Sequence, residues 1–231
     1  LPIQSETGAN VLNTLAMGGT YLPTDITNAC KEAVEQLSDE EFWEACEKSI
    51  RESLEAFEEN GIYLPIQKYV FTVMLSDPKH PMVKLSGDYC GDGGIPGYIT
   101  GTIVPNSTSL TMLPVALAHE TNHNVRWQFI KWHSEITLAD MLVSEGLAEV
   151  FAAYKFGEDK IGKWVTETSK ETLEFVIKPM IVQHLNDKDF NAVSSYLYGD
   201  EIMAIRGQKP VGMPYCGGYA CGYAMIQYYL E

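Results

Sequence analysis

Apolar and polar residues alternate at helical spacing early in the chain. Ser38 and Glu41 form a capping box, and Asn60 and Gly61 end the stretch that follows it. Within that stretch the apolar residues recur every three or four positions, at Phe42, Cys46, Ile50, Leu54 and Phe57. The pattern predicts an amphipathic helix, with another helix before it at residues 28–36 and an irregular lead-in up to residue 25.

Two later stretches have the composition of strands. Residues 69–75 are rich in β-branched and aromatic residues and are bounded by Ser-Asp-Pro, which predicts a buried strand. Residues 98–104 predict a second strand, which Pro105 closes. Between them, residues 90–97 contain four glycines and a proline, so we expect a flexible loop there, and the strand next to it could form the rim of a cleft.

The rest of the chain has mainly helical periodicity. One helix is expected from about Thr111 to Trp132, with Pro114 in its first turn. The next begins at the capping pair Thr137 and Asp140 and runs to about residue 156. Further helices are expected at residues 167–185, 189–197 and 217–231. This order predicts an α+β fold, in which residues 1–60 form a helical lead-in and residues 61–231 form the main unit.

The composition is that of a globular protein with an acidic surface. The 231 residues include 16 basic and 31 acidic ones, which gives a formal charge of −15, and 45% of the residues are hydrophobic. A chain of this length can bury a core of its own. Its negative charge repels phosphate backbones, which argues against nucleic acid as a partner.

The apolar runs and the cysteines indicate in which cellular compartment the protein is expected. No apolar run approaches the ~20 residues that cross a bilayer, so we expect a soluble chain with no membrane span. Five cysteines, an odd number without a CxxC pair, exclude a CxxC zinc knuckle and favour a reducing compartment such as the cytoplasm. The first residue, Leu1, is not a methionine, so an exported form that has lost a leader stays open. The sequence also leaves the oligomeric state open.

The motif with the most specific chemistry is an HExxH sequence formed by His119, Glu120 and His123. On a helix, histidines four positions apart lie one turn apart on one face, so that both rings can reach one cation. Zinc binds imidazole nitrogen, and a catalytic zinc site has a third protein ligand and a free position for water. A chance match is the alternative, but the apolar residues 116–118 just before the motif favour a buried helix.

The third ligand has to come from elsewhere in the chain. The continuation HExxHxxGxxH is absent, because the next histidine after His123 is His133. A glutamate from the following helix is the other solution, and Glu145 has that position, 22 residues after His123. Gly146 beside it is unfavourable in a helix interior by about 1 kcal/mol relative to alanine, which indicates that another backbone approaches there.

Glu149 lies one turn beyond Glu145. We expect its carboxylate to accept a hydrogen bond from the far nitrogen of a ligand histidine, which would hold that ring in place. It is also the alternative third ligand if the helix is rotated. Both glutamates could instead be solvated residues on an exposed face, because glutamate is an ordinary helix former.

Three segments resemble the YjaZ-like family of predicted bacterial Zn-dependent proteases: AHETNH at 118–123, LVSEGLAEVFA at 142–152 and GGYACGYAMIQYYL at 217–230. The resemblance covers roughly residues 65–231, and in the two central helices it extends to the gluzincin-type metallopeptidases. It implies a zincin-like fold, in which a small mixed sheet packs on the HExxH helix and a mainly helical subdomain follows. It also implies that residues 98–104 form an edge strand whose Tyr98, Ile99, Thr100 and Gly101 pair with the substrate backbone.

Together these features predict a zinc-dependent peptidase that acts on a peptide or protein. One Zn²⁺ per chain would be held by His119, His123 and Glu145, while Glu120 takes the proton of the attacking water as general base. The resemblance implies the same four roles.

The developing oxyanion needs a further donor besides the metal. Tyr219 is the first candidate and Tyr223 the second, with His184 behind them, although core packing is the alternative for any one of thirteen tyrosines. Two other functions stay open. One is a catalytically weak or inactive metal-binding module that recognises peptides on a zincin scaffold, and the other is a metal hydrolase of non-peptide amides.

Overall fold

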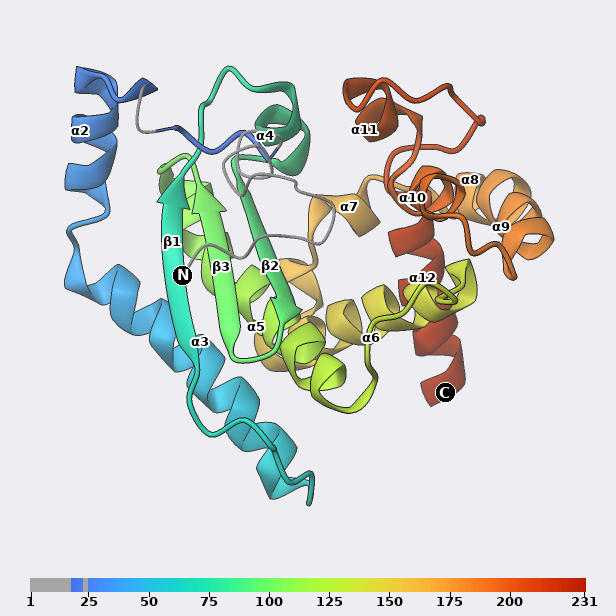
Figure 1. The fold of residues 1–231 in the computed structure, drawn as a ribbon, viewed down its shortest axis with the longest axis horizontal. Helices are drawn as coiled ribbons and strands as arrows, with labels where there is room; N and C mark the ends of the chain where they lie inside the picture. The colour runs from blue at the N-terminus through green and yellow to red at the C-terminus, as the bar shows by residue number, and fades with distance from the viewer. Residues whose placement is uncertain (1–17, 23–24) are drawn as a thin grey trace.

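The computed structural model describes residues 18–22 and 25–231, so most of the predicted lead-in lies outside the described residues. The fold is α+β (Figure 1): a small sheet with helices on one face, followed by a mainly helical half that contains the C-terminus. The division of the chain at residue 60 stays a prediction, and α3 (Glu40–Glu59) packs closely against α5 (Ser107–Phe129) beneath the sheet.

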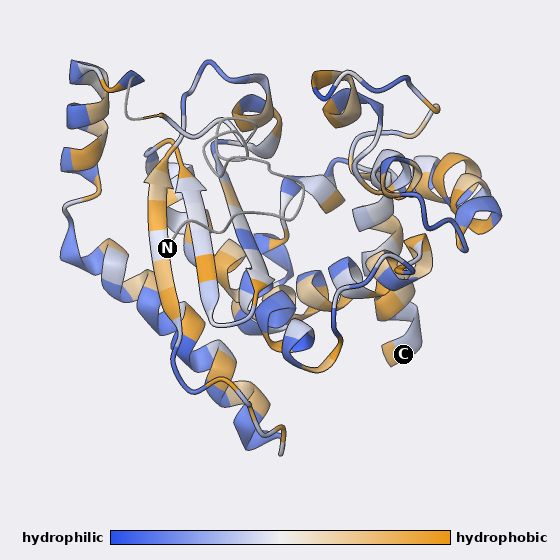
Figure 2. Cartoon of the chain, in the orientation of Figure 1, coloured by the Kyte–Doolittle hydropathy of each residue, from blue (hydrophilic) through white to orange (hydrophobic). Residues whose placement is uncertain are grey.

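The sheet has three strands and is mixed. β1 (Val70–Leu75) pairs in parallel with β3 (Tyr98–Ile103), and β2 (Tyr89–Ile95) pairs antiparallel with β3 on its other side. The strand order is therefore β1-β3-β2, with β3 in the centre. In Figure 2 most of β1 is coloured as hydrophobic, whereas hydrophobic and hydrophilic residues alternate along α3, as expected of an amphipathic helix.

Two sequence predictions for the sheet are wrong. Residues 90–97 are not a flexible loop, because most of them form β2, which ends in a turn at Pro96 and Gly97. Residues 98–103 form the predicted strand, but it is not an edge strand, since both neighbours bind its backbone. The backbone of Tyr98–Gly101 is thus not open to a substrate strand, and the side chain of Ile99 lies in the core.

The main core lies between the sheet and the two long helices. Its buried members come from α3, β2, β3 and α5, together with Leu37 just after α2: Leu37, Phe42, Cys46, Ile50, Tyr89, Ile99, Ile103, Leu113, Ala116 and Leu117. The helical pattern of residues 42–57 is confirmed. Its cap is Asp39 rather than Ser38, because the Asp39 carboxylate accepts the hydrogen bond from the Glu41 backbone N–H.

α5 begins four residues earlier than predicted, at Ser107. The side chain of Asn106 accepts hydrogen bonds from the backbone N–H groups of Thr108 and Ser109, so it caps the helix. Pro114 therefore lies inside the helix and not in its first turn.

The helical half begins with α6 (Leu138–Phe156), which starts at the predicted cap Thr137. It continues through shorter elements: η2 (Glu158–Lys160), α7 (Lys163–Thr166), α8 (Lys170–Thr172), η3 (Leu173–Ile177), α9 (Lys178–His184), α10 (Phe190–Tyr198) and α11 (Asp200–Ile205). α12 (Gly217–Leu230) ends the chain and packs across α6. The sequence predicted α2 (Asn28–Gln36) but missed α4 (Pro81–Ser86) and α11, which have six residues each.

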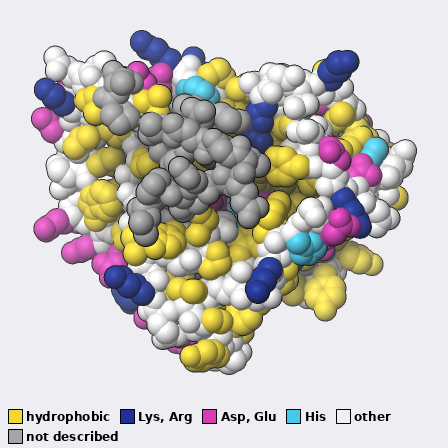
Figure 3. All heavy atoms as spheres, in the orientation of Figure 1, with side chains coloured by type: hydrophobic (Ala, Val, Ile, Leu, Met, Phe, Trp, Pro, Cys, Tyr) yellow, Lys and Arg dark blue, Asp and Glu magenta, His cyan; other side chains and the backbone are white. Residues whose placement is uncertain are grey.

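The surface bears few clusters of positive charge on the face drawn in Figure 3. Lys and Arg side chains there stand apart from one another, in line with a composition that has about twice as many acidic as basic residues. Among the described residues, no helix combines the length and the apolar character that a membrane span requires.

Candidate metal centre

α5 carries the HExxH residues on its buried side. His119 and His123 are four residues apart, one helical turn, and only 5% and 8% exposed. α6 runs beside α5 and brings Glu145, which is 5% exposed, to the same point. A helical hairpin thus places side chains from distant parts of the sequence around one small volume, as the spacing predicted.

Three donor atoms converge there. Nε2 of His123 lies 2.9 Å from Nε2 of His119 and 3.1 Å from Oε2 of Glu145. The distance between Nε2 of His119 and the same oxygen is 3.3 Å. Ligands that surround zinc tetrahedrally at about 2.0–2.1 Å lie about 3.3 Å from one another. Two imidazoles and one carboxylate at this spacing fit a zinc ion in both chemistry and size.

The electrostatics of the pocket favour a positive charge. Burial opposes a proton on His119, but Glu149, Glu145 and Glu120 outweigh it and raise the pKa of that imidazole well above its usual value. Burial likewise opposes the charge on Glu145, yet the two imidazoles lower the pKa of that carboxyl far below its usual range. A cation between these groups would offset the negative charge of the same carboxylates, as a proton on His119 does.

Two further residues orient the imidazoles. Oγ of Ser144 lies 3.1 Å from Nδ1 of His123, and Oε1 of Glu149 lies 3.0 Å from Nδ1 of His119, although that second pair is not aligned as an ideal hydrogen bond. Nε1 of Trp164, on α7, donates a hydrogen bond to the same oxygen of Glu149. These contacts turn both Nε2 atoms toward the common point.

The side chain of Glu120 extends from α5 toward the edge strand β2. Its Oε2 accepts a hydrogen bond of 2.7 Å from the backbone N–H of Gly93. Burial raises the pKa of this carboxyl, and the two imidazoles oppose the rise only in part. A Cβ on Gly91 would lie 2.3 Å from Cγ of Glu120, and one on Gly93 would lie 2.0 Å from the Glu120 carbonyl oxygen. Only glycine lets β2 approach the motif so closely.

Asn124, the residue after the motif, holds the β2–β3 turn against α5. Its side-chain amide donates to the carbonyls of Gly93, Ile95 and Tyr98 at 2.8–3.0 Å, and its Oδ1 accepts from the Gly97 backbone N–H at 2.8 Å. Asn124 is completely buried. The position of β2 relative to Glu120 is therefore fixed from the same helix that carries Glu120.

The predicted oxyanion donors lie in different surroundings. Burial and then the charge of Glu145 raise the pKa of Tyr219 well above its usual value, and its ring packs beside Tyr198 with the two ring centroids 6.0 Å apart. The hydroxyl of Tyr223 instead accepts a hydrogen bond from Gln227 on the same helix. His184 stacks on Tyr196 and pairs with an aspartate three residues on.

The backbone approach predicted at Gly146 is confirmed. A Cβ on Gly146 would lie 2.3 Å from the carbonyl oxygen of Gly222 on α12, and one on Gly222 would lie 2.4 Å from the carbonyl oxygen of Leu142. The two glycines thus allow α6 and α12 to cross in backbone contact. The crossing fixes how α12, which carries Tyr219, lies against α6, which carries Glu145.

Sequence reasoning missed Ser144 and Trp164. Ser144 precedes Glu145, so its place beside a ligand histidine could have been considered. Trp164 lies on a helix of four residues without a periodic pattern, and nothing in its local sequence indicates a contact with Glu149.

Comparisons with known proteins agree with the arrangement described above. Residues 42–231 match the family described as "Predicted Zn-dependent protease (DUF2268)". YjfC of Bacillus subtilis (strain 168), described as an uncharacterized protein, is 35% identical over 232 residues, which cover this whole chain and 76% of YjfC. YjaZ of the same organism is 28% identical over 116 residues, 49% of this chain and 41% of YjaZ. No solved structure matches. The chain belongs to this family of predicted Zn-dependent proteases.

Proposed function

We propose that the chain is a zinc-dependent peptidase with a zincin-like catalytic unit. One observation carries the proposal: two imidazoles and a carboxylate converge within 2.9–3.3 Å of one another, with a further buried carboxylate, Glu120, beside them on the same helix. His119, His123 and Glu145 would hold one zinc ion. At such a site zinc lowers the pKa of bound water towards about 7 and polarises a carbonyl group.

Glu120 acts as the general base. Gly93 binds its Oε2, which leaves Oε1 to take the proton of the attacking water. Its raised pKa suits this role, because a base that later releases the proton to the leaving amine needs a pKa nearer to the working pH than an exposed carboxyl has.

Tyr219 donates a hydrogen bond to the developing oxyanion. Its phenol is held in the protonated form, and a donor of this kind has to carry its proton throughout the reaction. Tyr198 lies beside it, with the two ring centroids 6.0 Å apart, and supports it from behind.

The substrate adds to β2 rather than to β3. β2 is the edge strand on the side of Glu120, and its glycines touch that residue. An extended peptide that pairs with such an edge gains main-chain hydrogen bonds whatever its sequence. We therefore keep strand addition as the mode of substrate binding, but with β2 in place of β3 as the strand that pairs with the substrate.

The test is the variant Glu120→Gln. It removes the base but keeps the size and the burial of the side chain, so it should still bind one equivalent of zinc while peptide cleavage falls by about 10²–10⁴-fold. Cleavage is measured on unfolded proteins and peptides with and without a chelator. Glu44→Gln, at an exposed position in α3, is the matched control and should cleave at the wild-type rate. Wild-type cleavage by the Glu120→Gln variant would rule out this base.

The ligand set has its own measurement. His123→Ala and Glu145→Ala should lose the zinc, whereas Glu149→Ala should bind it more weakly but still bind it. Zinc bound by the wild type without any cleavage would favour a metal-binding recognition module instead.

A further inference from the structure

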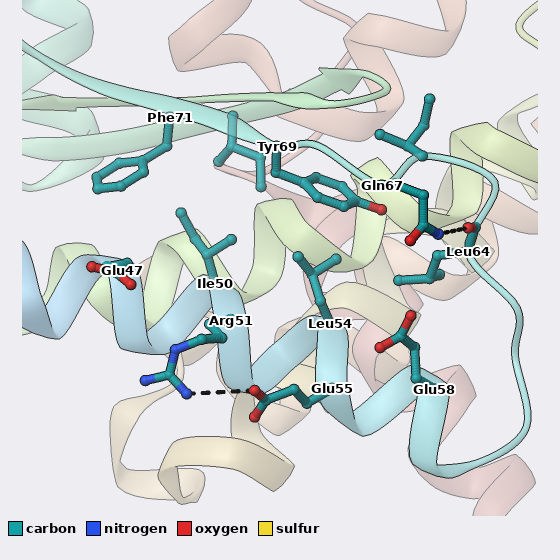
Figure 4. Close-up of a pocket in the computed structure, with 12 residues that line it drawn as sticks. Glu47, Ile50, Arg51, Leu54, Glu55, Glu58, Leu64, Gln67, Tyr69 and Phe71 are labelled. Carbon is teal, nitrogen blue, oxygen red and sulfur yellow. Dashed lines mark hydrogen bonds and ion pairs between the residues drawn. The ribbon is translucent and has the colours of Figure 1, made fainter.

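A groove of about 420 Å³ lies between α3 and β1, at the edge of the sheet away from β2 and the metal centre. Its floor is apolar. Ile50 and Leu54 of α3 face Phe71 and Tyr69 across it (Figure 4), and Ile99 also lines it. The volume falls within the range of about 300–1,000 Å³ that is typical of ligand sites. Nothing in the proposed peptidase mechanism uses this groove.

The rim of the groove is acidic. Glu47 and Glu58 lie at its two ends (Figure 4), and the described residues include no ion-pair partner for either. Arg51 also lines the groove, but its guanidinium pairs with Glu55 at 3.5 Å. The two end glutamates are eleven positions apart along the helix, a distance of about 16 Å. The groove therefore presents an apolar centre between two unpaired negative charges.

Within the described part of the chain, no backbone group pairs with the outer side of β1 beside the groove. Val70 and Ser76 donate their N–H groups to carbonyls at the β3 edge, each at 2.9 Å. Because successive residues of a strand point their backbone groups in opposite directions, Phe71 and Val73 point theirs away from β3. These groups form an edge that can accept another strand.

At Leu75 and Ser76, the end of the same β1 edge already pairs with another segment of the chain. The carbonyl of Leu75 accepts a hydrogen bond from the Tyr21 N–H at 3.1 Å, and Thr20 forms an antiparallel bridge with Ser76. Among the described residues, this pairing reaches Leu75, and none of them pairs with the outer side of Val73 or Phe71. The next positions along the edge lie directly beside the groove.

We propose that this groove is a second peptide-binding site, which takes an extended segment of another protein along the outer edge of β1. A bulky apolar side chain of the segment would fill the space over Ile50 and Leu54. Lys or Arg side chains would face Glu47 and Glu58. In an extended chain alternate residues point to the same face and each residue advances about 3.3 Å, so side chains four positions apart lie about 13 Å apart on one face, and flexible lysine side chains span the rest of the distance to the two glutamates. The proposal does not depend on the peptidase activity.

Charge favours a segment of another protein in the groove over residues 1–17 of this chain or a second copy of it. Residues 1–17 contain one glutamate and neither Lys nor Arg, so they offer no positively charged side chain to the two end glutamates. A second copy of the chain carries a net charge of −15 and is repelled as a whole. A basic and apolar segment of a different protein matches both features of the groove.

Binding of designed peptides tests the site. The protein is the full chain with Glu120→Gln, so that cleavage does not interfere. The probe is a blocked, dye-labelled peptide of eight residues in which a leucine lies midway between two lysines four positions apart, so that all three side chains share one face, and its partner carries glutamates in place of the lysines. Fluorescence anisotropy should show that the lysine peptide binds at least about tenfold more tightly, about 1.4 kcal/mol.

Charge reversal locates the binding. Glu47→Lys combined with Glu58→Lys should reverse the preference, so that the glutamate peptide binds more tightly. Glu44→Lys combined with Glu59→Lys is the matched control, because it changes the same helix and the net charge by the same amount outside the groove. It should keep the original preference. An equal effect of the two double variants would overturn the proposal.

Two further results decide the mode and the occupant. N-methylation of alternate peptide residues should abolish binding in one of the two alternating patterns only, and equal tolerance of both would overturn strand addition. A synthetic peptide of residues 1–17 should not compete with the lysine peptide. Effective competition by it, or a dimer in sedimentation that Glu47→Lys with Glu58→Lys dissociates, would assign the groove to the chain itself and overturn a partner site.

Discussion

Trp164 reaches the metal centre from α7, outside the helical hairpin that holds the ligands. Its indole N–H donates to Oε1 of Glu149, and that oxygen lies 3.0 Å from Nδ1 of His119. Glu149 is 2% exposed, so no water replaces a lost donor easily. A chain of three side chains therefore holds the ring of one ligand histidine.

Trp164→Phe should weaken zinc binding by about 10- to 100-fold, the usual effect of removing a group that orients a metal ligand. Phenylalanine keeps an aromatic ring beside His119 and Tyr89 but cannot donate to Glu149. Competition with a chromophoric chelator measures the affinity.

Trp43→Phe is the matched control for this change. The indole of Trp43 also donates one hydrogen bond, to the Leu37 carbonyl at 2.6 Å, but it lies in the core between α3 and the sheet. Zinc affinity should not change in this variant. If both tryptophan variants weakened zinc binding equally, the effect would come from packing and not from the contact with Glu149.

At the scale of elements, the crossing of α6 and α12 decides where Glu145 and Tyr219 lie. The helices touch at Gly146 and Gly222. In an exposed helix interior, replacing glycine by alanine stabilises by about 1 kcal/mol. At this crossing the added methyl group meets a backbone carbonyl, which cannot rotate away as a side chain does.

Gly146→Ala should therefore destabilise the protein, by about 1–3 kcal/mol, in spite of the better helix propensity of alanine. Urea unfolding measures the change. Cleavage should fall as well, because separating the helices moves Tyr219 away from Glu145. A variant as stable as the wild type would show that α12 does not rest on this glycine.

The sequence predicts elements well where the signal is local. The helices at residues 28–36 and 138–156 have capping residues at their own ends and appear within a residue of their predicted bounds. β2 could not be predicted in the same way, because its glycines are explained by Glu120 on a helix 27 residues later and not by their neighbours. The central position of β3 depends on strand order, which no single segment encodes.

The residues of the site divide in the same way, into those that local sequence spacing predicts and those that only the three-dimensional contacts reveal. His119, His123 and Glu145 were predictable, because the helical repeat and one hairpin bring them together. Ser144 and Trp164 were not, since their roles depend on which atoms face the imidazoles in three dimensions.

At the scale of the whole molecule, the metal centre joins the two halves of the fold. α5 packs under the sheet and carries two of the three residues that could hold the ion, while α6 begins the helical half and carries the third. Glu120, Glu145 and Glu149 are all less than 10% exposed. Carboxylates buried so close together repel one another unless a cation or protons lie between them.

Removing the metal should therefore lower the stability of the whole chain and not only its activity. Zinc at 100 to 1,000 times its Kd stabilises the folded state by about 2.7–4.1 kcal/mol. For a chain of this size, that corresponds to a rise in Tm of about 5–15 °C. Circular dichroism at helical wavelengths, with and without a chelator, measures the shift. Glu145→Gln should abolish the zinc-dependent shift and Glu44→Gln should keep it. A chelator-independent Tm in a sample that holds one equivalent of zinc would mean that the ion is bound elsewhere, because an ion between α5 and α6 cannot be removed without loosening the contact of the two halves.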